Sequence, residues 1–292
     1  MECKISNLNL EVKIEQIGAE LCSIKSKSTD REFVWNADPT IWGSTAPVLF
    51  PIIGGLKNGE TEYEGKKYAM PRHGIVRHNQ RIHVVNQEAD RITLRLASDE
   101  LTHKQYPFDF TFDISFRVKD NSVIVNHIIK NIDTRDMYFS VGAHPAFNCP
   151  INEGEHYSDY YLEFAERETL STSTLTPDGL VRNDSVEVIN NDTILPLTDH
   201  LFDNDALIFR NLKSRRVTLR SRKSDTALEV SFPDFNYLGI WAKPGAPFVC
   251  IEPWLGVADN IDGDGLLEHK EAIIKLPAGE KFEAKYSIRI IE

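Results

Sequence analysis

A histidine in a short turn-like segment is the first residue that could transfer a proton. His144 stands in residues 140–148 (SVGAHPAFN), after small residues and directly before Pro145. A residue that precedes proline is biased toward extended backbone, so we expect the imidazole to be held at the end of a strand. Its unperturbed pKa of about 6.5 would let it donate or accept a proton near neutral pH. The alternative is a structural histidine bonded to a backbone carbonyl.

A glutamate in an apolar segment is the second candidate. Glu252 is the only ionisable acid or base in residues 246–258, apart from the weakly acidic thiol of Cys250. Desolvation there would raise the pKa of its carboxyl toward that of a useful general base. The alternative is a glutamate on the solvent face of an edge strand. Trp241 and Trp254 lie close by in the sequence and offer flat surfaces suited to the C–H face of a sugar, although core packing would use them equally well.

Basic residues cluster around one glycine in residues 70–78 (MPRHGIVRH). Arg72, His73, Arg77 and His78 lie within seven positions in an otherwise acidic chain. Forked guanidinium groups suit a carboxylate, a phosphate or ring hydroxyls, so we expect ligand recognition here. A solvated basic turn paired with nearby acids is the competing interpretation.

Other known sequence motifs give no support for a metal site or for another class of enzyme. Residues 260–271 resemble a calcium-binding loop, but Pro253 and Gly256 precede it where a helix would be needed, so we expect a turn rich in Asp and Gly and no metal. The chain lacks the glycine-rich nucleotide loops, the G-x-S-x-G elbow and the H-E-x-x-H zinc motif. Dinucleotide chemistry, phosphoryl transfer from a nucleotide, triad hydrolysis and zinc proteolysis are therefore not indicated.

The elements that must position these residues are predicted to be strands. Alternating apolar and polar residues with many β-branched and aromatic side chains recur along the chain, whereas helical periodicity is almost absent. The clearest predicted strands are residues 91–97, 110–118, 122–130, 160–165, 217–221, 227–232 and 284–291. Residues 119–121 (KDN) should turn a hairpin, and residues 98–104 predict one short helix. Three long loops, residues 51–78, 140–150 and 244–264, would carry the chemistry.

Composition sets the remaining limits. The 292 residues carry a formal net charge of -11, which argues against nucleic-acid or anionic-membrane partners. No run of 18 apolar residues and no signal-like N-terminus is present, so we expect a cytoplasmic protein. The four cysteines are scattered along the chain without a C-x-x-C motif, so the sequence indicates neither a disulfide framework nor a thiolate metal site. Serial strands without a dividing linker predict one antiparallel β-sandwich domain over residues 1–292.

Five segments in order give the chain a family resemblance. Residues 49–63, 71–77, 140–148, 201–209 and 240–259 together resemble the aldose 1-epimerase (galactose mutarotase-like) family, most closely its smaller LacX-type branch. The resemblance implies an all-β fold, a large antiparallel β-sandwich of the galactose mutarotase-like supersandwich type with few short helices. It also implies a sugar-binding concave face, no metal and no organic cofactor, in a monomer or homodimer.

The resemblance also implies roles for individual residues. His144 matches the general acid, Glu252 the general base, His73 a sugar-contacting histidine and Asp205 a hydroxyl-binding aspartate, with Asp203 as a neighbouring candidate. The pair would open the hemiacetal ring of an aldohexose and close it as the other anomer. Both groups would then need pKa values near the working pH.

One position departs from the family pattern. Many relatives carry an arginine where this chain has Gly55, so Arg72, Lys57 or Arg77 would supply the sugar-binding cation. Relatives that act on hexose 6-phosphates use arginines near an HG-x-x-R segment, which keeps a phosphorylated aldose as an alternative substrate. A non-catalytic carbohydrate-binding or sensing protein, and an accessory domain of a polysaccharide enzyme, are the alternatives to a free-standing mutarotase.

Overall fold

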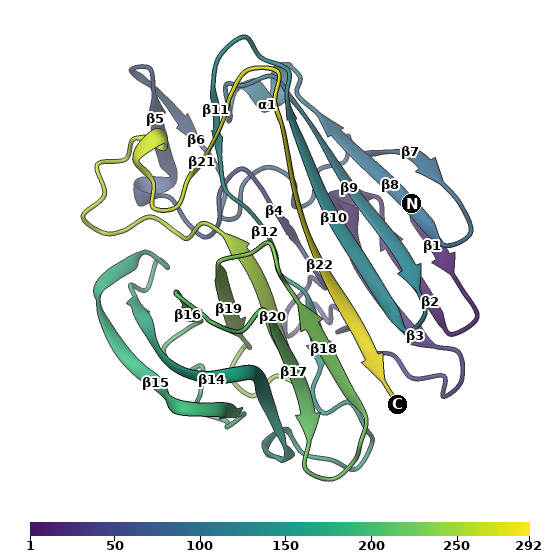
Figure 1. Cartoon of the computed structure of the whole chain (residues 1–292). Helices are drawn as coiled ribbons and strands as arrows, with labels where there is room; N and C mark the ends of the chain where they lie inside the picture. The colour runs from purple at the N-terminus through teal and green to yellow at the C-terminus, as the bar shows by residue number, and fades with distance from the viewer.

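Antiparallel strands make up most of the chain. The computed structural model describes residues 1–292 (Figure 1). Its largest sheet has 15 strands, ordered β4-β12-β20-β19-β16-β14-β17-β18-β22-β10-β9-β8-β7, with β13 paired to β20 and β15 to β14. The bounds of its first eight strands are β4 (Val48–Leu49), β7 (His83–Gln87), β8 (Arg91–Ala97), β9 (Phe110–Lys119), β10 (Ser122–Asn131), β12 (Val141–Ala143), β13 (Ala146–Asn148) and β14 (Tyr160–Leu175). The other seven are β15 (Val181–Pro196), β16 (Leu207–Phe209), β17 (Arg216–Ser221), β18 (Ala227–Ser231), β19 (Tyr237–Trp241), β20 (Phe248–Leu255) and β22 (Lys281–Ile291).

Smaller elements complete the fold. A three-stranded sheet is formed by β1 (Glu2–Ser6), β2 (Leu10–Glu15) and β3 (Glu20–Ser26), while β5 (Glu60–Tyr63) pairs with β6 (Lys66–Ala69) and β11 (Met137–Phe139) with β21 (Ile274–Leu276). The single α-helix, α1, spans Glu100–His103 and is capped by the side chain of Asp99. Four 3₁₀ turns lie at Ile17–Ala19, Lys57–Gly59, Tyr157–Asp159 and Leu267–His269. No helix is long and apolar enough to cross a membrane.

The predicted hairpin shows how alternation builds the sheet. In β9 and β10 every second side chain is buried, and Lys119 pairs with Ser122 across a turn in which Asp120 has φ 51°. The last strand, β22, lies between β10 and β18 and pairs with both of them. The C-terminal strand therefore joins the two halves of the sheet (Figure 1). The all-β prediction is confirmed.

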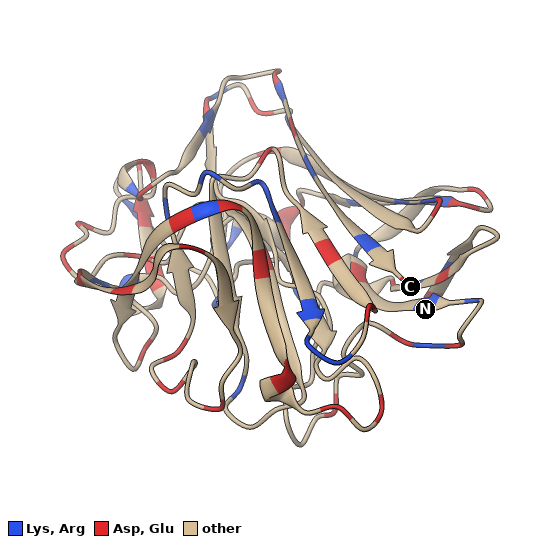
Figure 2. Ribbon diagram, turned by 60° about the horizontal axis from the view of Figure 1, so that its bottom comes forward, with Lys and Arg blue, Asp and Glu red and all other residues tan.

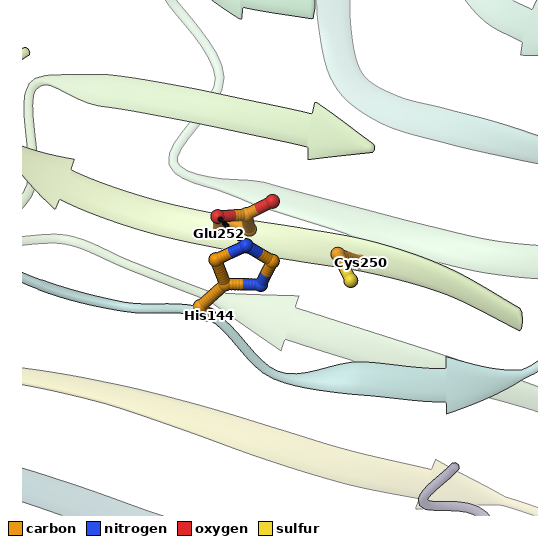
Figure 3. Close-up of side chains that lie close together, drawn as sticks. All are labelled: His144, Cys250 and Glu252. Atoms are coloured by element: carbon orange, nitrogen blue, oxygen red, sulfur yellow. Dashed lines mark ion pairs between the residues drawn. The ribbon is translucent and has the colours of Figure 1, made fainter. Parts of the chain in front are cut away.

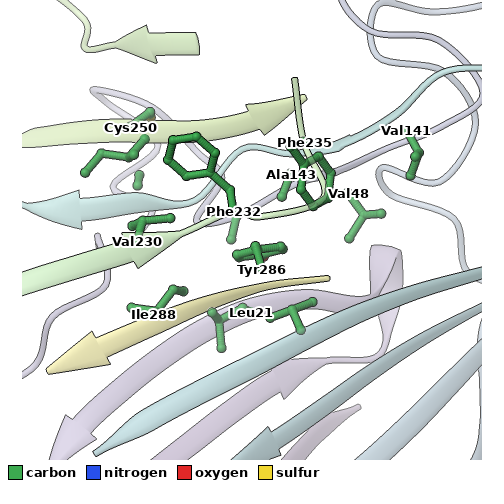
Figure 4. Packing of buried hydrophobic residues seen from close by; sticks show 14 of the residues in the cluster. Leu21, Val48, Val141, Ala143, Val230, Phe232, Phe235, Cys250, Tyr286 and Ile288 are labelled. Carbon is green, nitrogen blue, oxygen red and sulfur yellow. The ribbon is translucent and has the colours of Figure 1, made fainter. Parts of the chain in front are cut away.

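The main sheet and the N-terminal sheet contribute to one hydrophobic core. A cluster of 74 buried residues runs from Cys3 to Ile290 and includes side chains of both sheets. Figure 4 shows Leu21 of β3 among the packed side chains that include Val230 of β18 and Ile288 of β22. This shared core supports the single-domain prediction for residues 1–292, which stays a prediction. Charged residues are spread over the strands and connecting loops (Figure 2).

The predicted loops are partly wrong. Residues 244–264 contain β20, residues 140–150 contain β12 and β13, and residues 51–78 contain the β5–β6 hairpin. All eight residues of β20 are buried, so this strand lacks the alternation that marks a half-exposed strand. Its continuous apolar run, interrupted by a proline and a glutamate, led to the loop interpretation.

Candidate active site

Glu252 lies in the middle of the buried strand β20. This strand is flanked by β12 and β13 on one side and β19 on the other, and Glu252 is 1% exposed. Across the ladder it pairs with Gly239, and a Cβ at Gly239 would lie 2.6 Å from the Trp254 indole. The absent side chain therefore lets Trp254 cover the strand beside the carboxylate, in a central strand and not at a sheet edge.

His144 is held directly opposite this carboxylate. It lies between β12 and β13, its backbone N–H donates to the carbonyl of Pro47 at 3.0 Å, and it is 8% exposed. Its Nε2 atom is 3.2 Å from Oε2 of Glu252, and Figure 3 shows the two side chains facing each other. The extended backbone expected before Pro145 thus places the imidazole against the base candidate.

Burial shifts the pKa values of His144 and Glu252 in opposite directions. Desolvation lowers the pKa of His144 from 6.5 to about 3, and desolvation raises the pKa of Glu252 well above its usual value, opposed by the charge of Arg72. We expected both pKa values near the working pH, whereas each group alone favours its neutral form. The pair therefore carries one transferable proton across the neutral range.

A glycine turn brings a second histidine into the site. His73 has φ 70° and is followed by Gly74, where a Cβ would lie 2.2 Å from the carbonyl oxygen of Phe50. Nδ1 of His73 accepts a hydrogen bond from the N–H of Gly54 at 3.2 Å. This bond assigns the remaining proton of the neutral ring to Nε2, which can then donate to a ligand. Desolvation, helped by the neighbouring His144, lowers the pKa of His73 well below 6.5, so the ring stays neutral.

These side chains line one pocket of about 270 Å³. Its lining residues come from segments far apart in the chain, and they are Trp42, Arg72, His73, Arg77, His144, Asp205, Ala206, Trp241, Glu252 and Trp254. Every predicted site residue except Lys57 is among them. Flat apolar walls with a few convergent polar groups are typical of small-ligand sites.

Aromatic rings support the histidine. Trp42 stacks on His144 with ring centroids 5.1 Å apart and planes at 26°, while Trp241 meets the same imidazole edge-on at 5.8 Å. The sequence analysis missed Trp42, because residues 36–45 carry no motif and lie about 100 positions before His144. The only available signal was a tryptophan in a segment rich in turn residues.

The pocket carries cations without an acidic partner of their own. Arg77 donates through Nη2 to Ser44 Oγ at 2.9 Å, and its buried Nε has no hydrogen-bond partner. The guanidinium of Arg72 lies against Gly179, where a Cβ would be 2.6 Å from Nη1. Neither arginine forms an ion pair with a carboxylate. Both positive charges remain available to a ligand.

The structure separates the two aspartate candidates. Asp205 has φ 77°, its Oδ1 accepts the N–H of Ala206 at 2.8 Å, and its side chain lines the pocket. Asp203 instead pairs with the exposed His200 at 2.9 Å and does not line the pocket. Asp205 is therefore the one placed to contact a ligand.

Lys57 lies outside this pocket. Its Nζ donates to the carbonyl of Gly263 at 3.0 Å, on a separate polar hollow between the β5–β6 hairpin and residues 263–265. The Cβ direction of Gly55 points toward the carbonyl of Asp178 at 3.6 Å, next to the glycine that Arg72 covers. Arg72, and not Lys57, therefore lies close to Gly55, the position at which we expected an arginine from the family pattern.

Acidic residues of the calcium-like segment are paired with other residues of the protein. Asp264 accepts the N–H of Leu266 at 3.0 Å and pairs with His269 at 2.7 Å, while Glu271 pairs with Arg210 at 2.8 Å. A turn is formed at residues 260–263, where the N–H of Gly263 donates to the carbonyl of Asn260 at 2.9 Å, in agreement with the predicted turn.

Fold and pocket together define an all-β protein with a buried acid–base pair in an aromatic-walled site. The chain belongs to the aldose 1-epimerase family, whose model matches residues 1–266. It is 35% identical to the plasmid-borne protein LacX of Lactococcus lactis subsp. lactis over the full length of both chains.

Solved structures agree with this assignment. A galactose mutarotase related enzyme from Lactobacillus acidophilus is 38% identical, with a TM-score of 0.95 over 99% of this chain and 97% of the other. A galactose mutarotase-like protein from Lactobacillus casei is 28% identical, with a TM-score of 0.93 over 99% and 100% of the two chains. The predicted family and fold are confirmed.

Proposed function

We propose that this protein is an aldose 1-epimerase that interconverts the α and β anomers of an aldohexose, with His144 and Glu252 as its proton-transferring pair. The observation that carries the proposal is the 3.2 Å contact between Nε2 and Oε2 at the wall of the pocket. His73 and Asp205 are proposed to hold sugar hydroxyls, and Trp241 the apolar face of the ring.

The spacing of the pair suits a hemiacetal. The ring oxygen and O1 of an aldose are bonded to the same carbon, so one acid and one base must act almost side by side. Glycoside hydrolases instead separate their two carboxyl groups by about 5–9.5 Å, to flank a glycosidic bond or admit a water. A contact of 3.2 Å between acid and base supports ring opening over glycoside hydrolysis.

One proton completes the cycle. When the sugar binds, the shared proton moves from Glu252 to His144 across their 3.2 Å contact. Glu252 then removes the proton of O1, the bond between C1 and the ring oxygen breaks as the C1 carbonyl forms, and His144 protonates the ring oxygen. After rotation about the C1–C2 bond, Glu252 returns its proton to the carbonyl oxygen and His144 recovers its own as the ring closes. The open-chain state has the proton on Glu252 and a neutral His144, the forms that burial favours.

Equilibration of fresh anomers tests the proposal. Optical rotation or NMR of dissolved α-galactose and α-glucose should reach equilibrium faster with the protein than in buffer. Glu252→Gln should lower kcat/KM by at least about 100-fold, because it removes the base and leaves the shape of the side chain. Glu153→Gln, at an exposed position, is the control. Sugar binding without any acceleration would instead select a non-catalytic carbohydrate-binding protein.

A phosphorylated aldose is the second candidate substrate. Arg72 and Arg77 line the pocket without a carboxylate partner, and paired guanidinium groups are suited to a phosphate. A hexose 6-phosphate would use the same acid and base at C1, and its phosphate would neutralise these cations.

A further inference from the structure

A third functional side chain, Cys250, lies beside the acid–base pair and is not used in ring opening. It precedes Glu252 by two positions on β20, so both side chains project from the same face of the strand (Figure 3). Cys250 is fully buried, is not part of a disulfide and packs in the core near Phe232 (Figure 4).

The three side chains have the spacing of metal ligands. One ligand atom from each of His144, Cys250 and Glu252 lies within 4.8 Å of the other two, and Nε2 and Oε2 are 3.2 Å apart. Zinc bonds of about 2.0–2.3 Å in tetrahedral geometry place adjacent ligand atoms roughly 3.3–3.7 Å apart. At 3.2 Å the histidine and glutamate atoms lie just below this range, and the thiol, at most 4.8 Å from either of them, enters it after a movement of at most about 1 Å.

We propose that His144, Cys250 and Glu252 form a binding site for one zinc-like divalent transition-metal ion, and that the bound ion inhibits the epimerase. The inhibition, but not the binding, rests on the function proposed above.

The donor set selects the class of ion. A thiolate, an imidazole and one carboxylate favour Zn²⁺, Co²⁺ or Cu²⁺, whereas Mg²⁺ and Ca²⁺ prefer oxygen ligands. Oε2 of Glu252 is buried without a hydrogen-bond partner, so a cation between it and Nε2 of His144 would satisfy an acceptor that the fold leaves unpaired. Three protein ligands leave a fourth position, which faces the pocket because His144 and Glu252 line it.

Coordination would stop proton transfer without damaging the fold. The ion would take the lone pair of the imidazole and that of the carboxylate, and two protons would leave to solvent: the one shared by His144 and Glu252, and the thiol proton of Cys250. No group then remains to accept the O1 proton or to protonate the ring oxygen.

Cobalt spectroscopy tests binding independently of activity. Wild type, Cys250→Ala and the matched control Cys149→Ala, which removes another fully buried thiol, would each be titrated with Co²⁺ and then with Zn²⁺. We expect a thiolate-to-cobalt charge-transfer band in wild type and Cys149→Ala, and none in Cys250→Ala. Surface histidine–aspartate pairs such as His269–Asp264 can bind these ions weakly but give no thiolate band. Absence of the band in wild type overturns the proposal, even if both variants fail to fold.

Inhibition is measured separately. Micromolar Zn²⁺ should reversibly inhibit wild type and Cys149→Ala, with recovery on addition of a chelator. Cys250→Ala should remain active and need at least about tenfold more Zn²⁺. Equal sensitivity of the two variants would overturn the proposed ligand set. A cobalt band in a protein without any epimerase activity would confirm the metal site and contradict only the proposed function.

Discussion

Nε2 of His144 lies 3.2 Å from Oε2 of Glu252, in a site where neither side chain is more than 10% exposed. Burial makes both charged forms unfavourable, so the two groups share one proton instead of titrating separately. Acid–base catalysis here depends on a proton that stays within the pair, and this has a consequence for the pH profile.

We predict that kcat/KM stays nearly constant from pH 7 down to pH 5. The pKa of His144 is lowered to about 3, so the pair takes up a second proton only in stronger acid. For an exposed histidine with a pKa of about 6.5, the fraction in the basic form would fall about 25-fold over the same interval. Polarimetric rates, corrected for spontaneous mutarotation at each pH, measure the profile. A midpoint near pH 6.5 would contradict a buried, shared proton.

Arg72→Gln should distinguish the two candidate substrates. If a 6-phosphate binds the unpaired guanidinium, the substitution lowers kcat/KM for the hexose 6-phosphate by about tenfold or more and changes that for the free hexose much less. Arg182→Gln removes the same charge at an exposed position away from the pocket and should affect neither. An equal loss for both sugars would show that Arg72 contacts a part they share.

Trp42→Ala should lower kcat/KM by about tenfold, because the ring that stacks on His144 is lost and the imidazole gains freedom to rotate. Trp42→Phe keeps an aromatic face and should recover most of the activity. Steady-state kinetics measure the effect, and thermal unfolding of both variants checks the fold. If Ala and Phe lose the same activity, support of the imidazole by stacking is not the role of Trp42.

Sequence patterns predicted some elements well. Residues 91–97 were predicted as a strand and form β8 at the same positions, because their alternation matches a half-buried strand. β14 extends to Leu175, ten residues beyond the prediction, since Glu166 and Arg167 interrupt the alternation at a point where the strand irregularly pairs with β15. β20 was missed because both of its faces are buried.

Residues of the candidate site could be predicted where their neighbours in the sequence indicated a functional role. His144 and Glu252 were found from their local contexts, but their 3.2 Å contact depends on the pairing of β13 with β20 across about 100 residues. Lys57 was proposed because it lies two positions after Gly55 in the sequence, and its side chain points to a different hollow. Side-chain direction in a turn is set by tertiary packing, which sequence spacing does not encode.

Gly74→Ala should be destabilising and should displace His73. The position has φ 82°, and a Cβ would lie 2.2 Å from the carbonyl oxygen of Phe50, a backbone atom that cannot move away freely. Gly65→Ala is a matched control, because its φ is 74° and a Cβ there would meet nothing within 4 Å. We expect a loss of about 1 kcal/mol for the control and at least about 2 kcal/mol more for Gly74→Ala. Urea unfolding measures the difference, and similar losses would mean that backbone conformation alone sets the cost.

His127→Leu should stabilise the protein, most of all in mild acid. Both ring nitrogens of His127 are buried without a hydrogen-bond partner, among Phe112, Phe235 and Tyr286. Desolvation lowers its pKa from 6.5 to about 3, so the unfolded chain binds more protons than the folded one between these values. Stability therefore falls as the pH drops below about 6.5, and this residue alone accounts for about 2 kcal/mol at pH 5.

Urea unfolding of wild type and His127→Leu at pH 7 and pH 5 measures this effect. At pH 7 we expect a gain of about 1–2 kcal/mol, since the unpaired polar atoms are removed. At pH 5 the gain should grow by about 2 kcal/mol, because leucine takes up no proton in the unfolded chain. His83→Gln, which removes a histidine at an exposed position on β7, is the control. A gain that is the same at both pH values would mean that His127 is protonated, or finds a partner, in the folded protein.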